Sequence, residues 1–193
     1  MADREADRRL PAHDRGRFRT SVAFADQMPL DEGTFDGAIS SFVLQLVPNR
    51  ARALREGRRV LRPGGIFSFV TWLEDDRDFA PDRVFDEVLD EAGIEPPGPE
   101  TRSGDLPSVE RTVNELRRAG FRDVTAEGSW LAYAFTVEHY IAFMAEFDEA
   151  TLFDEMDRSF RERVLDRLHE RLSRLRPDEL TMRFPIVFAS AHR

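Results

Sequence analysis

Three apolar runs in the first half of the chain have the composition of buried β-strands. They cover residues 21–25, 37–47 and 66–72. The second run is nearly continuous in apolar residues, which is typical of a parallel strand covered on both faces. Between the second and third runs, Leu54 and Leu61 lie a heptad apart, and Asn49 can cap a helix that runs to about residue 61. The pattern therefore predicts strand, strand, helix, strand over residues 21–72.

The second half of the chain predicts several helices and two further strands. Apolar residues recur at helical spacing in residues 83–92, 108–119, 136–147 and 158–176. Gly93 and Gly120 follow the first two stretches, as glycines at helix C-termini do. Residues 124–135 and 182–191 are predicted strands, with Phe184, Ile186 and Phe188 on one face of the last. Strands and helices that alternate in this way indicate a doubly wound α/β sheet.

The amino-acid composition excludes several kinds of catalytic and binding site. The 193 residues include 28 basic and 37 acidic side chains, for a net charge of −9, and every basic one is arginine. The sequence therefore excludes a Schiff-base or P-loop lysine, and its lack of cysteine excludes a thiolate nucleophile. The four histidines have no metal-ligand spacing, so no metal site is predicted. The acidic balance argues against nucleic acid as a partner.

Neither a membrane segment nor a signal peptide is predicted. The first twenty residues carry charges throughout, and the longest uncharged run, residues 37–49, falls well short of the roughly 20 apolar residues that span a bilayer. We therefore expect a cytoplasmic protein that does not bind membranes. The acidic run of Glu74, Asp75, Asp76 and Asp78 is interpreted as a solvated loop rather than a magnesium site.

An ordered set of short motifs lies within residues 22–72. Its pieces are, in order, Ala25-Asp26, Pro29-Leu30, Thr34-Phe35-Asp36, Ala53-Leu54-Arg55-Glu56 and Arg59-Val60-Leu61-Arg62-Pro63-Gly64-Gly65. In order and spacing this set resembles the central motifs of class I S-adenosylmethionine-dependent methyltransferases. The likeness is to the small-molecule branch that includes the ubiquinone and menaquinone C-methyltransferases. It is close over residues 22–72 and extends to the rest of the chain only in outline.

The resemblance implies S-adenosylmethionine as the cofactor and assigns four residues to it. Asp26 stands where the family has the acid that receives the adenine amino group, and a carboxylate suits that role because the bond is charge-assisted. The backbone of Gln27 would lie beside the adenine ring. Ser41 and Phe42 would line the cofactor at the carboxyl edge of the sheet, where ligands of open α/β sheets bind. A simpler interpretation is that Asp26 is a turn residue before Pro29.

Two further residues are candidates for the substrate pocket. Gln45 stands where many relatives carry histidine, near the expected position of the methyl group, and Trp72 ends the predicted strand 66–72. A simpler interpretation makes Gln45 a solvated or satisfied polar group, and Trp72 a residue of the core or of the pocket wall. No catalytic residue is predicted, because methyl transfer from a sulfonium depends on alignment and exclusion of water.

The resemblance also implies that part of the family's fold is missing. Relatives begin with a strand, a glycine-rich G-x-G-x-G loop and a second strand ending in an acid. Here only Gly16 precedes residue 21, and no apolar strand does. The family's sheet order is 3-2-1-4-5-7-6, so losing strands 1 and 2 leaves residues 37–47 on an open edge. We expect a Rossmann-like sheet of the class I methyltransferase type, incomplete at its N-terminal end, with helical lid insertions.

One methyltransferase-like domain is expected over residues 1–193. It comprises a polar N-terminal helix or loop at 1–20, the core motifs at 21–72, a lid insertion at 73–107, and a C-terminal part at 108–193 with a helical insertion at 136–176 and the final strand. Two functions stay open: methyl transfer to a small-molecule acceptor, or a non-catalytic remnant that pairs, as a homodimer, through the exposed strand edge. A start codon further upstream, a genuine remnant and a differently closed sheet would each explain the missing part.

Overall fold

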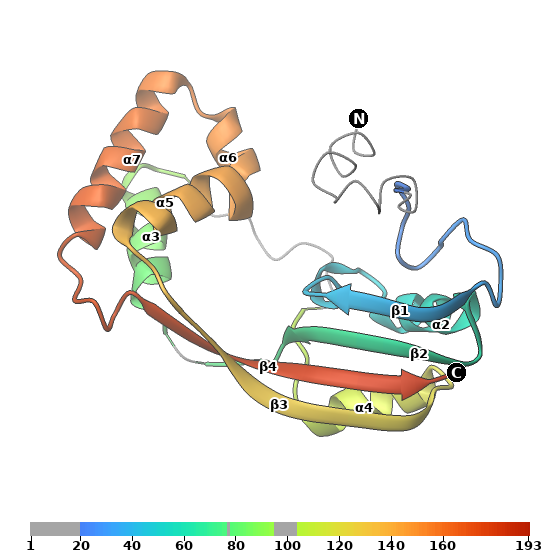
Figure 1. Ribbon diagram of the computed structural model, residues 1–193. Helices are drawn as coiled ribbons and strands as arrows, with labels where there is room; N and C mark the ends of the chain where they lie inside the picture. The colour runs from blue at the N-terminus through green and yellow to red at the C-terminus, as the bar shows by residue number, and fades with distance from the viewer. Residues whose placement is uncertain (1–19, 77, 95–103) are drawn as a thin grey trace, which may run out of the picture.

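A mixed four-stranded sheet forms the centre of the molecule. The computed structural model describes residues 20–76, 78–94 and 104–193 (Figure 1). The strand order is β1-β2-β4-β3. β1 (Phe35–Ser41) is parallel to β2 (Leu61–Trp72), whereas β4 (Thr181–His192) is antiparallel to both β2 and β3 (Arg122–Ala134). This is the 4-5-7-6 part of the expected order, so the predicted fold class is confirmed and β1 is an edge strand of the described sheet.

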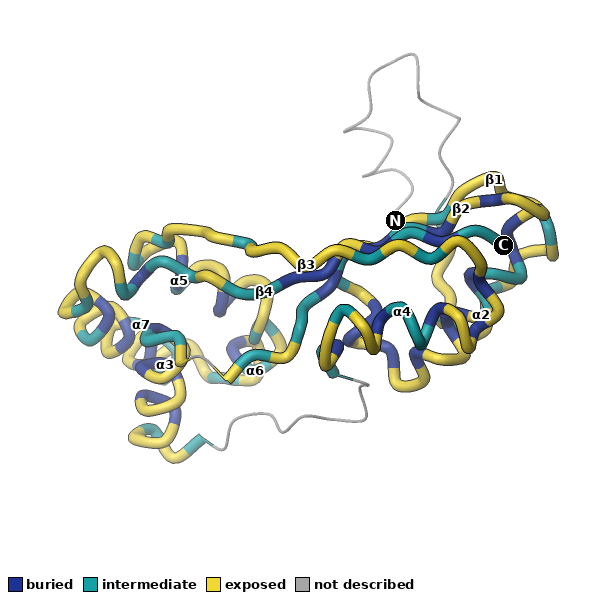
Figure 2. The backbone as a smooth tube through the Cα atoms, turned by 90° about the horizontal axis from the view of Figure 1, so that it is seen from below, coloured by how far each residue is buried: buried dark blue, intermediate teal, exposed yellow. Residues whose placement is uncertain are grey.

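Two helices cover one face of this sheet. α2 (Arg50–Val60) connects β1 to β2, and α4 (Val109–Arg118) precedes β3; both lie on the same side (Figure 2). The predicted caps are confirmed, since Asn49 accepts a hydrogen bond from the Arg52 backbone N–H at 3.0 Å and Ser108 accepts one from that of Arg111 at 3.1 Å. The core between helices and sheet includes Leu54, Phe67, Phe69, Leu116, Val187 and Ala189.

The opposite face of the sheet lies largely open in the described part of the chain. Ile39 of β1 is 86% exposed and Phe188 of β4 is 51% exposed. Phe184 and Ile186 share the face of Phe188, as predicted, but only Ile186 is fully buried. This face therefore exposes large apolar side chains, and the free edge of β1 exposes unpaired backbone N–H and C=O groups. Both are surfaces at which another part of a protein can bind.

The remaining helices form a second lobe beyond one end of the antiparallel pair of β3 and β4 (Figure 2). They are α3 (Ala80–Glu91), α5 (Val137–Phe143), a π-helical turn (Met144–Asp148), α6 (Ala150–Glu155) and α7 (Arg158–Leu172). Their separate core includes Phe85, Leu89, Tyr140, Phe153, Leu168 and Leu172. Thr136 caps α5, as predicted, by accepting a hydrogen bond from the His139 backbone N–H at 3.2 Å.

Two of the predicted strands differ from the structure. Residues 21–25 form no strand; they end in a tight turn in which the Gln27 N–H donates to the Phe24 carbonyl at 3.0 Å. No neighbouring strand of the described chain pairs with them, and without backbone hydrogen bonds to a neighbour an extended segment does not form a stable strand. The strand predicted over residues 37–47 ends at Ser41, because Phe42 has a left-handed backbone with φ 49° and a 3₁₀ turn (Leu44–Leu46) follows.

None of the described helices is both long and apolar enough to cross a bilayer. The cytoplasmic location stays a prediction. The polar helix or loop expected at residues 1–20 lies almost entirely outside the described residues.

Candidate functional site

The chain turns sharply where β1 ends. Phe42 is one of two described non-glycine residues with positive φ, a conformation that costs about 1–3 kcal/mol and persists only where surrounding contacts enforce it. Its N–H donates to the Val70 carbonyl of β2 at 2.9 Å, and its carbonyl accepts from Gln45 Nε2 at 2.9 Å. Thr71 Oγ1 donates to Gln45 Oε1 at 2.5 Å. Gln45 is only 7% exposed, and the two ends of its amide bond to Phe42 in the turn and to Thr71 of β2. The amide therefore fixes the turn to the neighbouring strand.

A pair of aromatic rings lies beside this turn. The ring centroids of Phe42 and Trp72 are 4.5 Å apart, and Trp72 in turn lies edge-on to Phe184 at 6.1 Å. Offset and edge-on ring pairs of this kind contribute about 0.5–1.5 kcal/mol beyond the area they bury. The predicted residues Phe42 and Trp72 are therefore brought together, although 30 positions separate them in the sequence.

A cavity of about 440 Å³ lies along the free edge of β1. Its lining includes Ala25, Met28, Leu30, Ile39, Ser41 and Val43. Ser41 is thus on its wall, and Asp26 and Gln27 lie in the turn between two of its lining residues, with the Asp26 carboxylate 3.9 Å from Arg52 of α2. Of the four residues predicted for the cofactor, only Ser41 lines this cavity; Asp26, Gln27 and Phe42 are sequence neighbours of lining residues.

Helix α2 fixes the loop that forms one side of this cavity. Glu56 accepts a hydrogen bond from the Met28 N–H at 3.1 Å, while Arg59 donates to the Leu30 carbonyl at 2.8 Å and the Met28 carbonyl at 3.2 Å. Glu56 and Arg59 also pair with each other at 2.8 Å, and the guanidinium lowers the pKa of the Glu56 carboxyl. Because α2 carries these contacts, the sequence motif around Glu56 and Arg59 has a structural role at the cavity.

A second cavity, of about 260 Å³, lies where the two lobes meet. We call it the aromatic pocket; its lining is Trp72, Leu73, Asp75, Phe79, Asp82, Asp105, Phe135, Tyr140, Phe143, Asp148, Met182 and Phe184. Four of these residues are aspartates, six are aromatic, and none is basic. Negative charge and the faces of aromatic rings both attract cations, so the pocket has the chemistry of a site for a positively charged group.

One hydrogen bond ties the acidic side of the aromatic pocket to its aromatic wall. Tyr140 donates its hydroxyl to Asp82 Oδ1 at 2.8 Å. Asp82 is exposed as a residue, but the packing around its carboxylate removes enough water to raise its pKa. Desolvation and the nearby carboxylates also raise the pKa of Tyr140 well above its usual value, so this phenol stays protonated and remains a donor.

Sequence reasoning missed this pocket, apart from Trp72. Its four aspartates come from four separate segments that only the folded chain brings together. The hydrogen-bonded residues Asp82 and Tyr140, for example, are 58 positions apart. Asp75 belongs to the acidic run that was interpreted as a solvated loop; it is only partly exposed and lines the pocket, whereas Glu74, Asp76 and Asp78 are exposed as expected. No group of three or more potential metal ligands occurs among the described residues.

Known proteins similar to this chain are methyltransferases. A family model described as a methyltransferase domain matches residues 2–69. The chain is 36% identical over 106 residues to a sarcosine/dimethylglycine N-methyltransferase of Halorhodospira halochloris, covering 55% of this chain and 34% of that protein. It is 42% identical over 50 residues to the ubiquinone/menaquinone biosynthesis C-methyltransferase UbiE of Geobacter sp. (strain M21), covering 26% and 21%. The chain thus spans about a third or less of these two relatives.

Structural comparison agrees with the sequence matches. A crystal structure of a methyltransferase of unconfirmed activity from Bacillus halodurans C-125 superposes with a TM-score of 0.50 at 17% identity, over 88% of this chain and 75% of that one. At this identity the likeness concerns the fold, and the shared fold is the one that the strand order indicates. Together with the ordered motifs and the family match over residues 2–69, it supports a fold of the class I S-adenosylmethionine-dependent methyltransferase type for this chain.

Proposed function

We propose that this protein transfers a methyl group from S-adenosylmethionine to a small-molecule acceptor. The observation that carries the proposal is the position of the Phe42–Trp72 ring pair. Phe42 directly follows Ser41 on the wall of the β1 cavity, and Trp72 lines the aromatic pocket. A donor in the first cavity and an acceptor in the second would therefore approach each other beside these rings, as an in-line displacement requires.

The residues of the β1 cavity fit the adenosine half of the cofactor. Ala25, Met28 and Leu30 offer apolar walls for a flat base, and Asp26 lies at their side as an acceptor for an amino group. Ser41 adds a hydroxyl that can hydrogen-bond the sugar or the amino-acid part. For the methionine half the fit is incomplete, because no glycine-rich loop borders the cavity in the described part of the chain. Once bound, the cofactor supplies a methyl group on a positively charged sulfur.

The aromatic pocket supports an amine as the acceptor. One relative is named for sarcosine and dimethylglycine, which are amines that also carry a carboxylate. This pocket has carboxylates and ring faces that attract an ammonium group, but it has no basic residue to bind such a carboxylate. Before reaction the nitrogen must lose its proton, and Asp82 is suited to accept it because its pKa is raised. The nitrogen lone pair then forms the N–C bond as the C–S bond breaks. Because no basic residue lines the pocket, we expect acceptors without an anionic group.

Calorimetric titration of S-adenosylmethionine into the full chain tests the donor half of the proposal. Replacing Asp26 with asparagine removes the charge at the adenine position and is expected to weaken binding about tenfold. The matched control is Asp36→Asn, a change of the same kind at an 84% exposed side chain near the start of β1, which should leave binding unchanged. No heat at millimolar cofactor from a folded chain would reject the proposal.

A second titration, with amines in the presence of S-adenosylhomocysteine, tests the acceptor half. A secondary or tertiary amine should bind more tightly than its carboxylate-bearing analogue, and Asp82→Asn should remove the preference. Equal affinity for the two would reject an amine while leaving the methyltransferase assignment in place.

The alternative, a non-catalytic module that pairs through an open strand edge, is not favoured by the comparisons, because the relatives named above are methyltransferases by name. Pairing as such is compatible with catalysis and stays a prediction. β1 offers the edge for it, with Ile39 largely exposed. Light scattering of the full chain would detect the dimer, and a strictly monomeric species would contradict it.

A further inference from the structure

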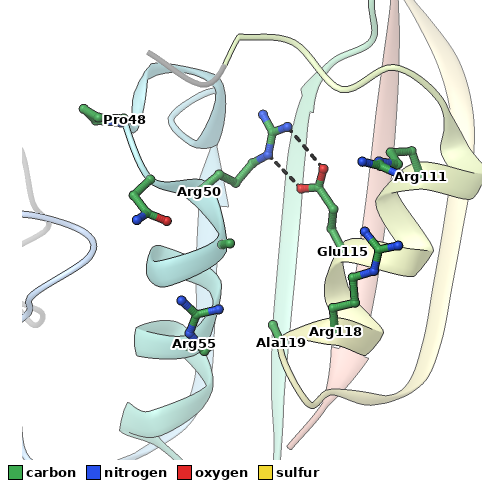
Figure 3. A pocket seen from close by; sticks show the side chains of 9 residues that line it. Pro48, Arg50, Arg55, Arg111, Glu115, Arg118 and Ala119 are labelled. Atoms are coloured by element: carbon green, nitrogen blue, oxygen red, sulfur yellow. Dashed lines mark hydrogen bonds and ion pairs between the residues drawn. The ribbon is translucent and has the colours of Figure 1, made fainter. Parts of the chain in front are cut away.

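A third cavity, of about 420 Å³, lies on the outer side of the sheet lobe between α2 and α4. It is lined by Pro48, Asn49, Arg50, Ala51, Arg55, Arg111, Glu115, Arg118 and Ala119 (Figure 3). Four of these nine residues are arginine and one is acidic, in a protein whose net charge is −9. We call it the arginine cavity. It shares no lining residue with the β1 cavity or the aromatic pocket.

The single acid of the arginine cavity is already neutralised. Glu115 accepts hydrogen bonds from Arg50 Nε at 2.9 Å and Arg50 Nη2 at 3.3 Å, a paired contact that Figure 3 shows across the gap between the helices. Arg50 also donates to the Gly104 carbonyl at 2.6 Å, and only 9% of it is exposed. This partly buried pair joins α2 to α4 and forms the inner wall of the cavity, and the charge of Glu115 is paired with Arg50 rather than with the other arginines.

The three remaining arginines carry charge without a partner in the described part of the chain. Arg55, Arg111 and Arg118 are exposed, and the side chains form no hydrogen bond or ion pair with another described residue. Most other described arginines do have an acidic partner; examples are Arg59 with Glu56 and Arg171 with Glu87. Three like charges around one cavity repel one another, and an anion placed between them relieves that repulsion.

We propose that the arginine cavity binds a small molecule that carries phosphate groups. Guanidinium groups are planar and present N–H donors in a fork that matches pairs of phosphate oxygens, and they keep their charge at any physiological pH. Three of them call for a ligand with two or more negative charges. The volume lies in the range of small-molecule sites, which makes a compact phosphate ester or a pyrophosphate group the right size. This site is separate from the proposed methyl-transfer site and does not depend on it.

Titration calorimetry with inorganic pyrophosphate, at constant ionic strength, tests the proposal on the full chain. Arg118→Gln and Arg111→Gln should each weaken binding about tenfold, since each removes charge-assisted hydrogen bonds. The matched control is Arg117→Gln, because Arg117 is the neighbouring exposed residue of α4 but does not line the cavity; it should change the affinity less than about twofold. All three side chains are on the surface, so the variants should fold.

Three results would overturn the proposal. The first is the absence of binding by the folded wild-type chain at millimolar pyrophosphate. The second is equal weakening by Arg117→Gln and Arg118→Gln, which would mean diffuse attraction to a basic helix. The third is displacement of pyrophosphate by single-stranded oligonucleotides with an affinity that rises with their length, which would make nucleic acid the occupant. Saturable binding of one pyrophosphate, lost in Arg118→Gln and kept in Arg117→Gln, supports it.

Discussion

The sheet lobe and the helical lobe reach stability in different ways. In the sheet lobe, α2 and α4 cover one face, whereas in the described part of the chain Ile39 and Phe188 are exposed on the other face and β1 has a free edge. In the helical lobe the core is closed, with Phe153 and Leu172 fully buried. The family motifs lie in the sheet lobe. The helical lobe shows only the packing pattern of its core in the sequence.

The largest effect expected from a single change is in the helical core. Replacing Phe153 with alanine should lower the free energy of unfolding by about 3–5 kcal/mol, because a fully buried ring is removed and its neighbours cannot fill the space. Phe147→Ala is the matched control: this ring is 76% exposed, and the cost should be under about 0.5 kcal/mol. Urea denaturation measures both, and similar values would mean that the helical core is not closed.

In the sheet lobe, the largest loss of stability is expected from breaking the ion pair between Arg50 and Glu115. Arg50→Met leaves Glu115 without its partner between α2 and α4, and we expect a loss of about 3 kcal/mol in the free energy of unfolding. Arg62→Met breaks a pair in which both side chains are more than half exposed, and should cost less than about 1 kcal/mol. If both variants lost the same small amount of stability in urea, the Arg50–Glu115 pair would not join the helices.

A smaller effect is expected at Asp82, where the lobes meet: the free energy of unfolding should depend on pH. The pKa of Asp82 is raised in the folded state, so on this account the wild-type chain loses stability as the pH rises through the ordinary value of 3.8 toward the folded pKa. Asp82→Asn keeps an acceptor for Tyr140 and removes that loss. The variant should therefore be slightly more stable than the wild type at neutral pH and equal to it below the ordinary value. Thermal unfolding at several pH values measures this, and a constant difference would contradict it.

The smallest effect is expected at the surface between α3 and α7. Glu91 accepts hydrogen bonds from Arg171 at 2.7 Å and Arg167 at 3.3 Å, and these side chains are in contact with water. Glu91→Gln should cost little, and the cost should vanish in 1 M salt because screening removes surface pairs first. A loss that persists in salt would mean that packing rather than charge accounts for it.

Local signals in the sequence were sufficient for the helices. Asn49, Ser108 and Thr136 each cap the helix they were predicted to cap, since a cap involves only residues three or four positions away. The strand predicted at residues 21–25 was wrong because strand formation depends on a partner elsewhere in the chain. The overrun beyond Ser41 has another cause: the apolar run continues through Val43, and nothing in its composition reveals the left-handed backbone of Phe42.

The candidate site could be predicted only in part, for a related reason. Asp26, Gln27 and Ser41 were found from a set of motifs within residues 22–72; Ser41 lines the β1 cavity, and Asp26 and Gln27 lie in the turn between its lining residues Ala25 and Met28. Their role toward the cofactor stays a prediction. The aromatic pocket and the arginine cavity are built from segments far apart in the chain, and only the fold brings their charges together.

The position of β4 has a consequence for synthesis. This strand lies between β2 and β3 and pairs with both, yet the ribosome makes it after every other described strand. Until residues 181–192 emerge, β2 and β3 have no common neighbour, and both offer unpaired edges to other nascent chains. The sheet can therefore close only after this strand has been made, and until then the β1–β2 pair and β3 are open to misassembly.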